Sequence, residues 1–233
     1  MTSFQQKLAK AQNDAEREKL CLEAVKKSEG WAFGDVPEKF KTAKLCLEAV
    51  RQKPDALAYV PEKLKTAKLC FEAVKQETFG YFALPYVPEK FKTIKLYLVV
   101  VKDFGLALGD IPEIIKTEEL CFEAVKQNGE ALLYVPEKLK SAEMCLKAVR
   151  VAVMFQYVPE KFKTAEFCLE VVKMNGYMLR YIPEKLKTAK LCLEAVKAYI
   201  NGGTIALQFV PETIREEVKK AAEIKPSKQE KGK

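Results

Sequence analysis

The chain has 233 residues, of which 48% are hydrophobic and 31% are charged, and its mean hydropathy is −0.16. This composition supports a sizeable core and excludes a disordered chain, and no apolar run approaches the roughly 18 residues of a membrane span. Histidine is absent, which removes the commonest general base, the commonest zinc ligand and every serine–histidine or cysteine–histidine dyad. We therefore expect no catalytic residues, no metal ion and no cofactor.

The chain begins with a polar segment of mixed charge, residues 1–20, which lacks the apolar stretch and cleavage site of a secretory signal. We therefore expect a cytoplasmic protein. The formal net charge is +8, from 40 basic and 32 acidic residues. A share of +3 lies in residues 225–233, which we predict to form a disordered basic tail. The rest is spread over segments that alternate in sign, so composition indicates no basic patch.

One phrase, Val/Ile-Pro-Glu, recurs through the chain at intervals of 23 to 28 residues. Its prolines are Pro37, Pro61, Pro88, Pro112, Pro136, Pro159, Pro183 and Pro211. Such a period is typical of repeat proteins that stack one layer on the next. We predict a capping helix with a partial repeat over 1–36, seven tandem repeats over 37–210, and a polar capping helix over 211–224. Positions are numbered below from the repeat proline, so that +4 lies four residues after it.

The first predicted element of each repeat is a helix that follows position +5. Seven of the eight copies carry Thr or Ser there, and such a side chain caps the free N–H groups of a first helical turn. The next residues, such as AKLCLEAVR over 43–51, are mostly good helix formers with polar side chains on one stripe. Asn128-Gly129 and Asn175-Gly176 follow two of these helices and predict left-handed C-terminal caps.

The second predicted element is shorter and precedes the next Val-Pro. A residue before proline is driven toward extended geometry, whereas proline itself suits the start of a helix. We predict a turn or bent helix such as Ala131–Tyr134, a break at Val-Pro, and one helical turn after it. Two helical elements per repeat of about 24 residues predict an all-α fold, an α-solenoid of two-helix repeats in one continuous array.

A family resemblance rests on two phrases of one repeat, AVKQNG over 124–129 and ALLY over 131–134. They resemble the units of an uncharacterised bacterial family of short helical repeats, a domain of unknown function. The resemblance covers about residues 20–215 and implies a bacterial origin and a helical array, with no activity attached. This chain departs from the family in its Val-Pro-Glu phrase, because the family's units usually lack that proline.

Seven cysteines occupy one slot of the repeat, position +9. They are Cys21, Cys46, Cys70, Cys121, Cys145, Cys168 and Cys192, and the third full repeat carries Tyr97 instead. No pair has the CxxC spacing of a metal site. One cysteine per layer on an apolar helix face behaves as a small buried hydrophobe. We predict reduced, buried thiols and a reducing compartment.

A basic residue lies at position +14 of every full repeat. The row consists of Arg51, Lys75, Lys102, Lys126, Arg150, Lys173 and Lys197, and a second basic row lies at +4. Aligned cations on successive layers could bind a nucleic acid or another polyanion. Glutamate at +11 in five of the seven repeats can pair with the +14 row and weaken its field. We favour a solvated face and keep polyanion binding as the alternative.

The segment between each helix and the next Val-Pro-Glu differs from copy to copy and is rich in aromatic residues. A constant frame with a varied rim is how repeat proteins build recognition surfaces, although any one of these rings could simply fill a gap in the core. One region combines several departures: the loop over 79–85 is expanded, Val99 replaces a glutamate at +11, and Ile114 replaces a lysine at +2.

Apolar residues in place of charges mark contact surfaces. The candidate partner-binding residues are Phe79, Tyr81, Phe82, Val99, Phe104 and Ile114. We therefore expect a non-catalytic repeat scaffold that binds a protein or peptide, with weak self-association as a further possibility.

Overall fold

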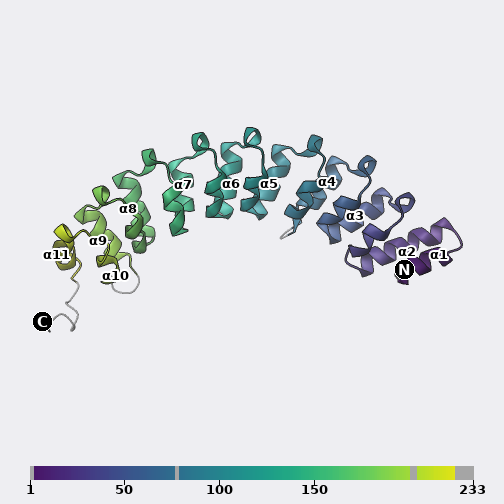
Figure 1. The fold of residues 1–233 in the computed structure, drawn as a ribbon, viewed down its shortest axis with the longest axis horizontal. Coiled ribbons are helices and arrows are strands. Elements are labelled where there is room, and N and C mark those ends of the chain that lie inside the picture. Colours follow the sequence, from purple (N-terminus) through teal and green to yellow (C-terminus); the bar gives the residue numbers. More distant parts are fainter. Residues whose placement is uncertain (1–2, 77–78, 200–203, 224–233) are drawn as a thin grey trace. The chain divides into compact units, whose positions relative to one another are not determined.

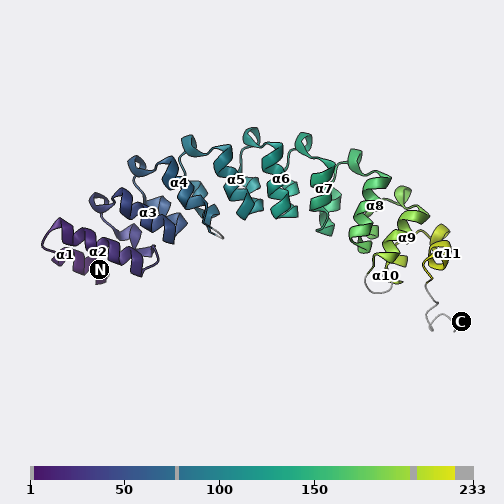
Figure 2. The same ribbon diagram turned by 180° about the vertical axis from the view of Figure 1, so that it is seen from behind.

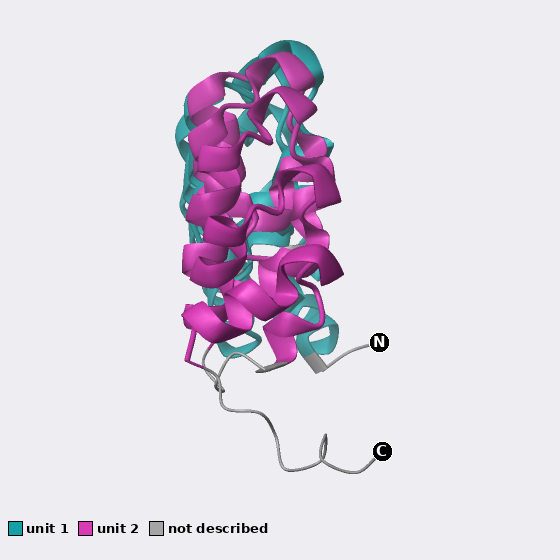
Figure 3. Ribbon diagram, turned by 90° about the vertical axis from the view of Figure 1, so that its left-hand side faces the viewer, with its two compact units in different colours: residues 1–116 teal, residues 117–233 magenta. Residues whose placement is uncertain are grey.

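The computed structural model describes residues 3–76, 79–199 and 204–223. It divides into two compact units, residues 1–116 and 117–233 (Figure 3). Every regular element of the described residues is a helix, which confirms the all-α, solenoid-like repeat fold. The boundary at 116/117 falls inside the repeat of Pro112, so the same pattern continues from one unit into the next.

Over its described residues, the first unit contains five α-helices and eight 3₁₀ helices (Figure 1). The α-helices are α1 (Ser3–Lys10), α2 (Asp14–Lys27), α3 (Ala43–Gln52), α4 (Ala67–Val74) and α5 (Ile94–Asp103). The 3₁₀ helices are η1 (Trp31–Asp35), η2 (Glu38–Phe40), η3 (Pro54–Tyr59), η4 (Glu62–Leu64), η5 (Gly80–Tyr86), η6 (Glu89–Phe91), η7 (Gly105–Asp110) and η8 (Glu113–Ile115).

The second unit repeats this order over its described residues (Figure 2). Its α-helices are α6 (Glu118–Gln127), α7 (Ala142–Ala148), α8 (Ala165–Met174), α9 (Ala189–Lys197), α10 (Thr204–Leu207) and α11 (Glu212–Ala221). Its 3₁₀ helices are η9 (Gly129–Tyr134), η10 (Glu137–Leu139), η11 (Ala152–Tyr157), η12 (Glu160–Phe162), η13 (Gly176–Tyr181) and η14 (Glu184–Leu186). Helix α11 occupies most of the predicted cap, and the predicted tail over 225–233 lies outside the described residues.

The repeat phrase explains where each helix begins. Thr42 Oγ1 accepts a hydrogen bond from the Leu45 N–H at 3.3 Å, and Ser141 caps Met144 in the same way at 3.2 Å. The residue before each of the first seven repeat prolines is extended; Val60, for example, has φ −78° and ψ 129°. The chain therefore leaves one 3₁₀ helix at Val-Pro and starts a single 3₁₀ turn before the next cap, as the sequence predicted.

The predicted Asn-Gly caps are wrong. Asn128 and Asn175 have φ of −141° and −155°, and neither following glycine has a positive φ. Glycine is required there for close approach instead. A Cβ on Gly176 would lie 2.1 Å from the Ala195 carbonyl oxygen of the next layer, and one on Gly129 would lie 2.8 Å from that of Ala148. Each asparagine accepts a hydrogen bond two residues ahead, as Asn128 does from the Glu130 N–H at 2.9 Å.

The core of each unit lies between the α-helices and the long 3₁₀ helices. All seven cysteines are buried and none forms a disulfide, as the repeat position predicted. Burial raises the pKa of Cys46 in the first unit and of Cys145 in the second to about 11. Equivalent thiols therefore meet equivalent surroundings in both units.

The +4 basic row is part of the frame. In five repeats the lysine side chain is 8–17% exposed and pairs with the +1 glutamate, as Lys65 does with Glu62 at 2.6 Å. Several also reach forward to the next repeat: Lys140 Nζ donates to the Tyr157 carbonyl at 3.1 Å. The +4 row, the second basic row considered for polyanion binding, is therefore largely buried and joins consecutive layers. Most of its charge is not available to a ligand at the surface.

Candidate partner-binding site

A groove of about 440 Å³ lies in the first unit, where three successive layers meet. Its lining residues are Glu29, Trp31, Gln52, Lys53, Pro54, Asp55, Phe79 and Phe82. Trp31, Phe79 and Phe82 are 73%, 59% and 54% exposed. Three large rings that converge on one concave surface offer more apolar contact area than scattered surface residues do.

Each ring reaches the groove through a local feature of the chain. Trp31 begins η1 directly after Gly30, whose φ of 89° lies in the left-handed region that favours glycine. Phe79 and Phe82 belong to the expanded loop and to η5. A Cβ on Gly80 would lie 2.1 Å from the Val74 carbonyl oxygen, so glycine lets the expanded loop pack closely against the end of α4.

Charged and polar groups at the groove have fixed positions. Lys53 Nζ lies 3.5 Å from the centroid of the Trp31 ring and 2.9 Å from Asp55 Oδ2, so a cation–π contact and an ion pair hold one side chain. Gln52 Nε2 donates to Glu48 Oε1 at 2.7 Å, while Gln52 Oε1 is buried with no hydrogen-bond partner among the described residues. The groove therefore combines an apolar surface with oriented polar groups at its edge.

A second set of contacts joins the expanded loop to the following layer. The ring of Tyr81 lies 5.7 Å from that of Phe82 and 4.8 Å from that of Phe104. The Tyr81 hydroxyl donates a hydrogen bond to Asp110, and this bond is the main reason that the pKa of Tyr81 is raised. Four of the six predicted partner-binding residues, Phe79, Tyr81, Phe82 and Phe104, thus form one connected cluster.

The other two predicted residues do not line this groove. Val99 is half-buried in α5, and the glutamate that it replaces belongs to a row that is itself mostly half-buried; Glu72, for example, is 14% exposed. The expectation of an exposed Val99 was therefore wrong, because the +11 position faces the neighbouring layer. Ile114 is 95% exposed on η8, apart from the groove.

The varied segments also contain rings that serve the core. Phe33 and Phe155 are buried, so the gap-filling interpretation holds for them. Trp31 lies in one of the varied segments but was not among the predicted partner-binding residues. Its position becomes clear only because Lys53 and Phe82, from two later layers, lie at the same groove.

The +14 row lies on the surface, but most of it is neutralised. Ion pairs with the +11 glutamates hold Lys75, Lys126, Lys173 and Lys197 at 2.8–3.7 Å. Arg51 Nε lies 3.6 Å from Glu72 Oε2 in the next layer, and hydrogen bonding to Lys75 lowers the pKa of Glu72. Lys102 and Arg150 belong to the repeats that lack a +11 glutamate. These contacts show the predicted pairing of the +14 row with the +11 glutamates.

A larger cavity of about 650 Å³ lies in the second unit. Its lining residues are Val149, Arg150, Val171, Met174, Asn175, Tyr177, Met178, Ala198 and Tyr199. Val149, Val171 and Met178 are buried core residues, so the floor of this cavity belongs to the packing between layers. No residue of the predicted partner-binding set lies here.

Two further observations limit the chemistry of the described residues. No three His, Cys, Asp or Glu side chains among them lie close enough together to hold a metal ion. No helix within the described ranges has the length and apolar character needed to cross a membrane.

The fold and the repeated phrase define a helical short-repeat protein, in which each layer combines one capped α-helix with two 3₁₀ segments. The model of one family, described as a domain of unknown function (DUF4116), matches residues 18–65, 93–140, 117–163, 141–187 and 164–215. The chain belongs to this family. A search of curated proteins and a search of solved structures each returned no match. The matched segments leave out residues 66–92, the stretch that contributes Phe79 and Phe82 to the groove.

Proposed function

We propose that the protein is a non-catalytic repeat scaffold that binds a protein or peptide partner in the groove beside Trp31. The observation that carries this proposal is the convergence of Trp31, Phe79 and Phe82, each more than half exposed, on one surface. Aromatic side chains dominate the energetics of protein interfaces because they bury large areas at small entropic cost. The expanded loop that supplies two of these rings lies outside the segments that match the family.

The groove suits an extended segment that carries an apolar anchor and polar groups beside it. The rings would cover the anchor, while Lys53 and Asp55 provide a donor and an acceptor at the edge. Burial of one large side chain contributes about 1.5–3 kcal/mol, which corresponds to roughly a tenfold to hundredfold gain in affinity. A site of this size suits a reversible partner rather than an obligate one.

The chain provides its own reporter, because Trp31 is its one tryptophan. Peptides selected from a displayed random library on the full chain should shift Trp31 emission to shorter wavelength as the ring leaves water. The variant Phe82→Ala keeps the reporter and should weaken binding about tenfold or more. Tyr157→Ala, which removes an exposed ring of the second unit, is the matched control and should bind normally.

Two results would contradict the proposal: selected peptides that leave Trp31 emission unchanged, or equal affinity for Phe82→Ala and the unmodified chain. Self-association through the groove would instead appear without peptide, as a concentration-dependent Trp31 shift that Phe82→Ala removes. The +14 row is a weaker candidate for function, because five of its seven members lie beside a carboxylate.

A further inference from the structure

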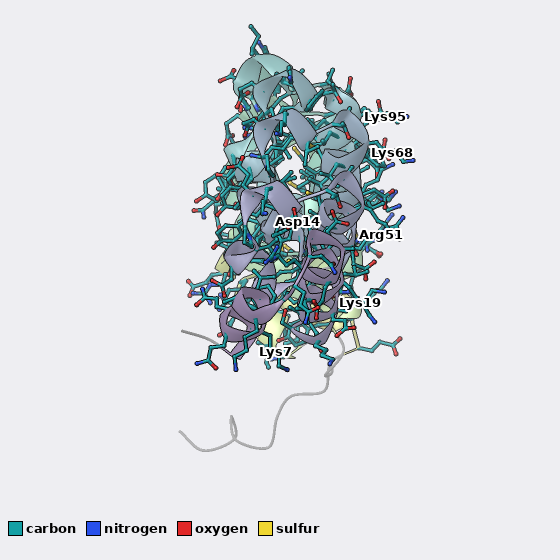
Figure 4. All side chains as sticks on the ribbon, turned by 90° about the vertical axis from the view of Figure 1, so that its right-hand side faces the viewer. Lys7, Asp14, Lys19, Arg51, Lys68 and Lys95 are labelled. Atoms are coloured by element: carbon teal, nitrogen blue, oxygen red, sulfur yellow. The ribbon has the colours of Figure 1, made fainter. Side chains whose placement is uncertain are left out.

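A second surface of the first unit carries a row of lysines at position +7, two residues before the cysteine slot. In the first unit this row consists of Lys19, Lys44, Lys68 and Lys95, all exposed. The equivalent residues of the second unit are Glu119, Glu143, Glu166 and Lys190. Figure 4 shows Lys19, Lys68 and Lys95 on one side of the first unit, together with Arg51. We call the four lysines of the first unit the lysine row.

The lysine row is free of the pairing that neutralises the +14 row. Among the described residues, no carboxylate oxygen lies within 4.0 Å of the amino groups of Lys44, Lys68 or Lys95. Lys63 and Lys90, at position +2, are exposed and likewise lack an ion pair within the described part of the chain. Lys39, by contrast, pairs with Asp14 at 3.2 Å. The charge of this surface is therefore available to a ligand.

Helix stability does not account for these lysines. Lys44, Lys68 and Lys95 lie in the first turns of α3, α4 and α5, where the helix dipole disfavours a cation and favours a carboxylate. The second unit has the favoured residue at three of its four equivalent positions. The first unit thus keeps unpaired cations at positions where its own fold gains from acidic residues.

Small recesses separate the lysines. One, of about 260 Å³ between α2 and α3, has Lys19 and Lys44 at its edge and Leu22, Phe40 and Leu45 in its lining, with Glu18 as its single acidic residue. The next, of about 210 Å³ between α3 and α4, is lined by Ala43, Leu47, Lys63, Leu64, Thr66, Lys68 and Leu69. Each recess therefore combines apolar walls with lysines at its edge.

We propose that the lysine row binds a single-stranded nucleic acid, with phosphates at the lysines and bases against the apolar recesses. A cationic track that follows the backbone, beside apolar surface for the faces of bases, is the general arrangement for single strands. A duplex keeps its bases paired and would leave the recesses empty. Neighbouring helices lie about 8–10 Å apart, and nucleotides rise about 3.4 Å each. One spacing therefore accommodates two or three nucleotides, and the three spacings from α2 to α5 accommodate about seven to nine.

A membrane surface is the weaker candidate for this row. Peripheral membrane helices place large apolar side chains beside their cations so that these enter the lipid. Helices α2–α5 expose one large apolar residue among those described, Ile94. The exposed rings of the groove lie near the C-terminal ends of α3 and α4, whereas the lysine row lies near the N-terminal ends. The two surfaces can therefore be tested separately.

Anisotropy of a fluorescein-labelled poly(U) of about 20 nucleotides, with the full chain, tests the proposal. The triple variant Lys44→Glu, Lys68→Glu and Lys95→Glu introduces the residues that the second unit already tolerates at these positions. Each lost phosphate contact weakens binding about fivefold at 0.1 M salt, so the affinity of the triple variant should fall about 100-fold. The slope of log affinity against log salt concentration should become smaller in magnitude by about 2. Its control, Lys126→Glu, Lys173→Glu and Lys197→Glu, carries the same charge change on paired cations and should lose less than about fivefold. Residues 225–233 are common to all variants.

A converse variant keeps the proposal testable if the triple variant fails to fold. Glu119→Lys, Glu143→Lys and Glu166→Lys should give the second unit an equivalent row and strengthen poly(U) binding. The proposal is overturned if the unmodified chain does not bind poly(U) at low salt, if both triple variants lose equal affinity, or if a duplex binds more tightly. Binding to phosphatidylserine vesicles without poly(U) binding would assign the row to a membrane surface instead. Phe82→Ala should bind poly(U) normally, so failure of the groove and failure of the row are separate results.

Discussion

The two units use the same frame and place their charges differently. Residues 1–116 and residues 117–233 each contain 20 basic and 16 acidic residues, so no measure of overall charge separates them. At position +7, however, the first unit has lysine in all four layers and the second has glutamate in three of four. Buried positions are therefore similar in the two units and preserve the layer, whereas the charge at an exposed position of the same helix changes sign. Candidate functional surfaces can be found by comparing such equivalent exposed positions.

The largest expected effect tests whether the frame is the same in both units. Leu57 in η3 and Leu132 in η9 occupy equivalent positions, and both are fully buried. Truncation of either to alanine should lower the free energy of unfolding by about 2–5 kcal/mol, as measured by urea denaturation with circular dichroism. A large loss at Leu57 with almost none at Leu132 would break the equivalence of the two units.

The next effect separates the buried basic row from the exposed one. Lys140 is 11% exposed, pairs with Glu137 and donates to the Tyr157 carbonyl. Lys140→Met should cost about 1–3 kcal/mol, because a charged hydrogen bond between layers is lost. Lys126 is 59% exposed and pairs with Glu123 at 3.3 Å, so Lys126→Met should change stability by less than about 0.5 kcal/mol. Equal costs in urea denaturation would contradict the division into frame and surface.

A smaller effect exchanges the +7 residues of the two units. Lys68→Glu should stabilise the first unit by about 0.3–1 kcal/mol, because a carboxylate in the first turn of α4 interacts favourably with the helix dipole. Glu143→Lys should destabilise α7 in the second unit by a similar amount. Both effects should shrink as salt is added. If Lys68→Glu lowers stability at low salt, the lysine row contributes to the fold and loses its functional interpretation.

The smallest effect concerns the hydrogen bond from Tyr81 to Asp110. Because the pKa of Tyr81 is raised in the folded chain, its stabilising contribution is complete below the unfolded pKa of about 10 and is lost as pH rises through the folded value. Ultraviolet titration of phenolate should show one fewer late-ionising tyrosine in Asp110→Asn than in the unmodified chain. An unchanged number of late-ionising tyrosines in Asp110→Asn would contradict the assignment of the shift to this bond.

Local chemistry allowed the sequence to predict most of the frame. The Thr42 cap, the break at Val60-Pro61 and the burial of Cys46 each depend on residues within a few positions of one another. The Asn128-Gly129 cap failed because a close approach to Ala148, in the next layer, determines the geometry of that glycine. Propensity near a helix end could not reveal that contact.

The site was predictable only where its residues are neighbours in sequence. Phe79, Tyr81 and Phe82 share one expanded loop, and Phe104 joins them through Tyr81. Trp31 and Lys53 reach the same groove from two other layers, a juxtaposition that depends on how the layers pack. The assignment of Val99 failed for the related reason that the exposure of a helix face depends on the neighbouring helix. The lysine row was not predicted, because its residues stand out only when the +7 positions of the two units are compared.

The hydrogen bond from a +4 lysine to a carbonyl of the following layer has a consequence for how such chains can change length. Lys41, Lys140 and Lys187 donate to carbonyls 18, 17 and 22 residues ahead, and in each case the acceptor lies two residues before the next repeat proline. The repeat phrase therefore defines both the donor and the acceptor of this hydrogen bond, whatever the number of residues between them. Loops can lengthen without a shift of register, and duplication or removal of a whole repeat restores the same lysine-to-carbonyl contact at the new junction. A gene built this way can gain or lose layers by recombination between its own repeats, while each surviving loop keeps the freedom to acquire a new binding surface.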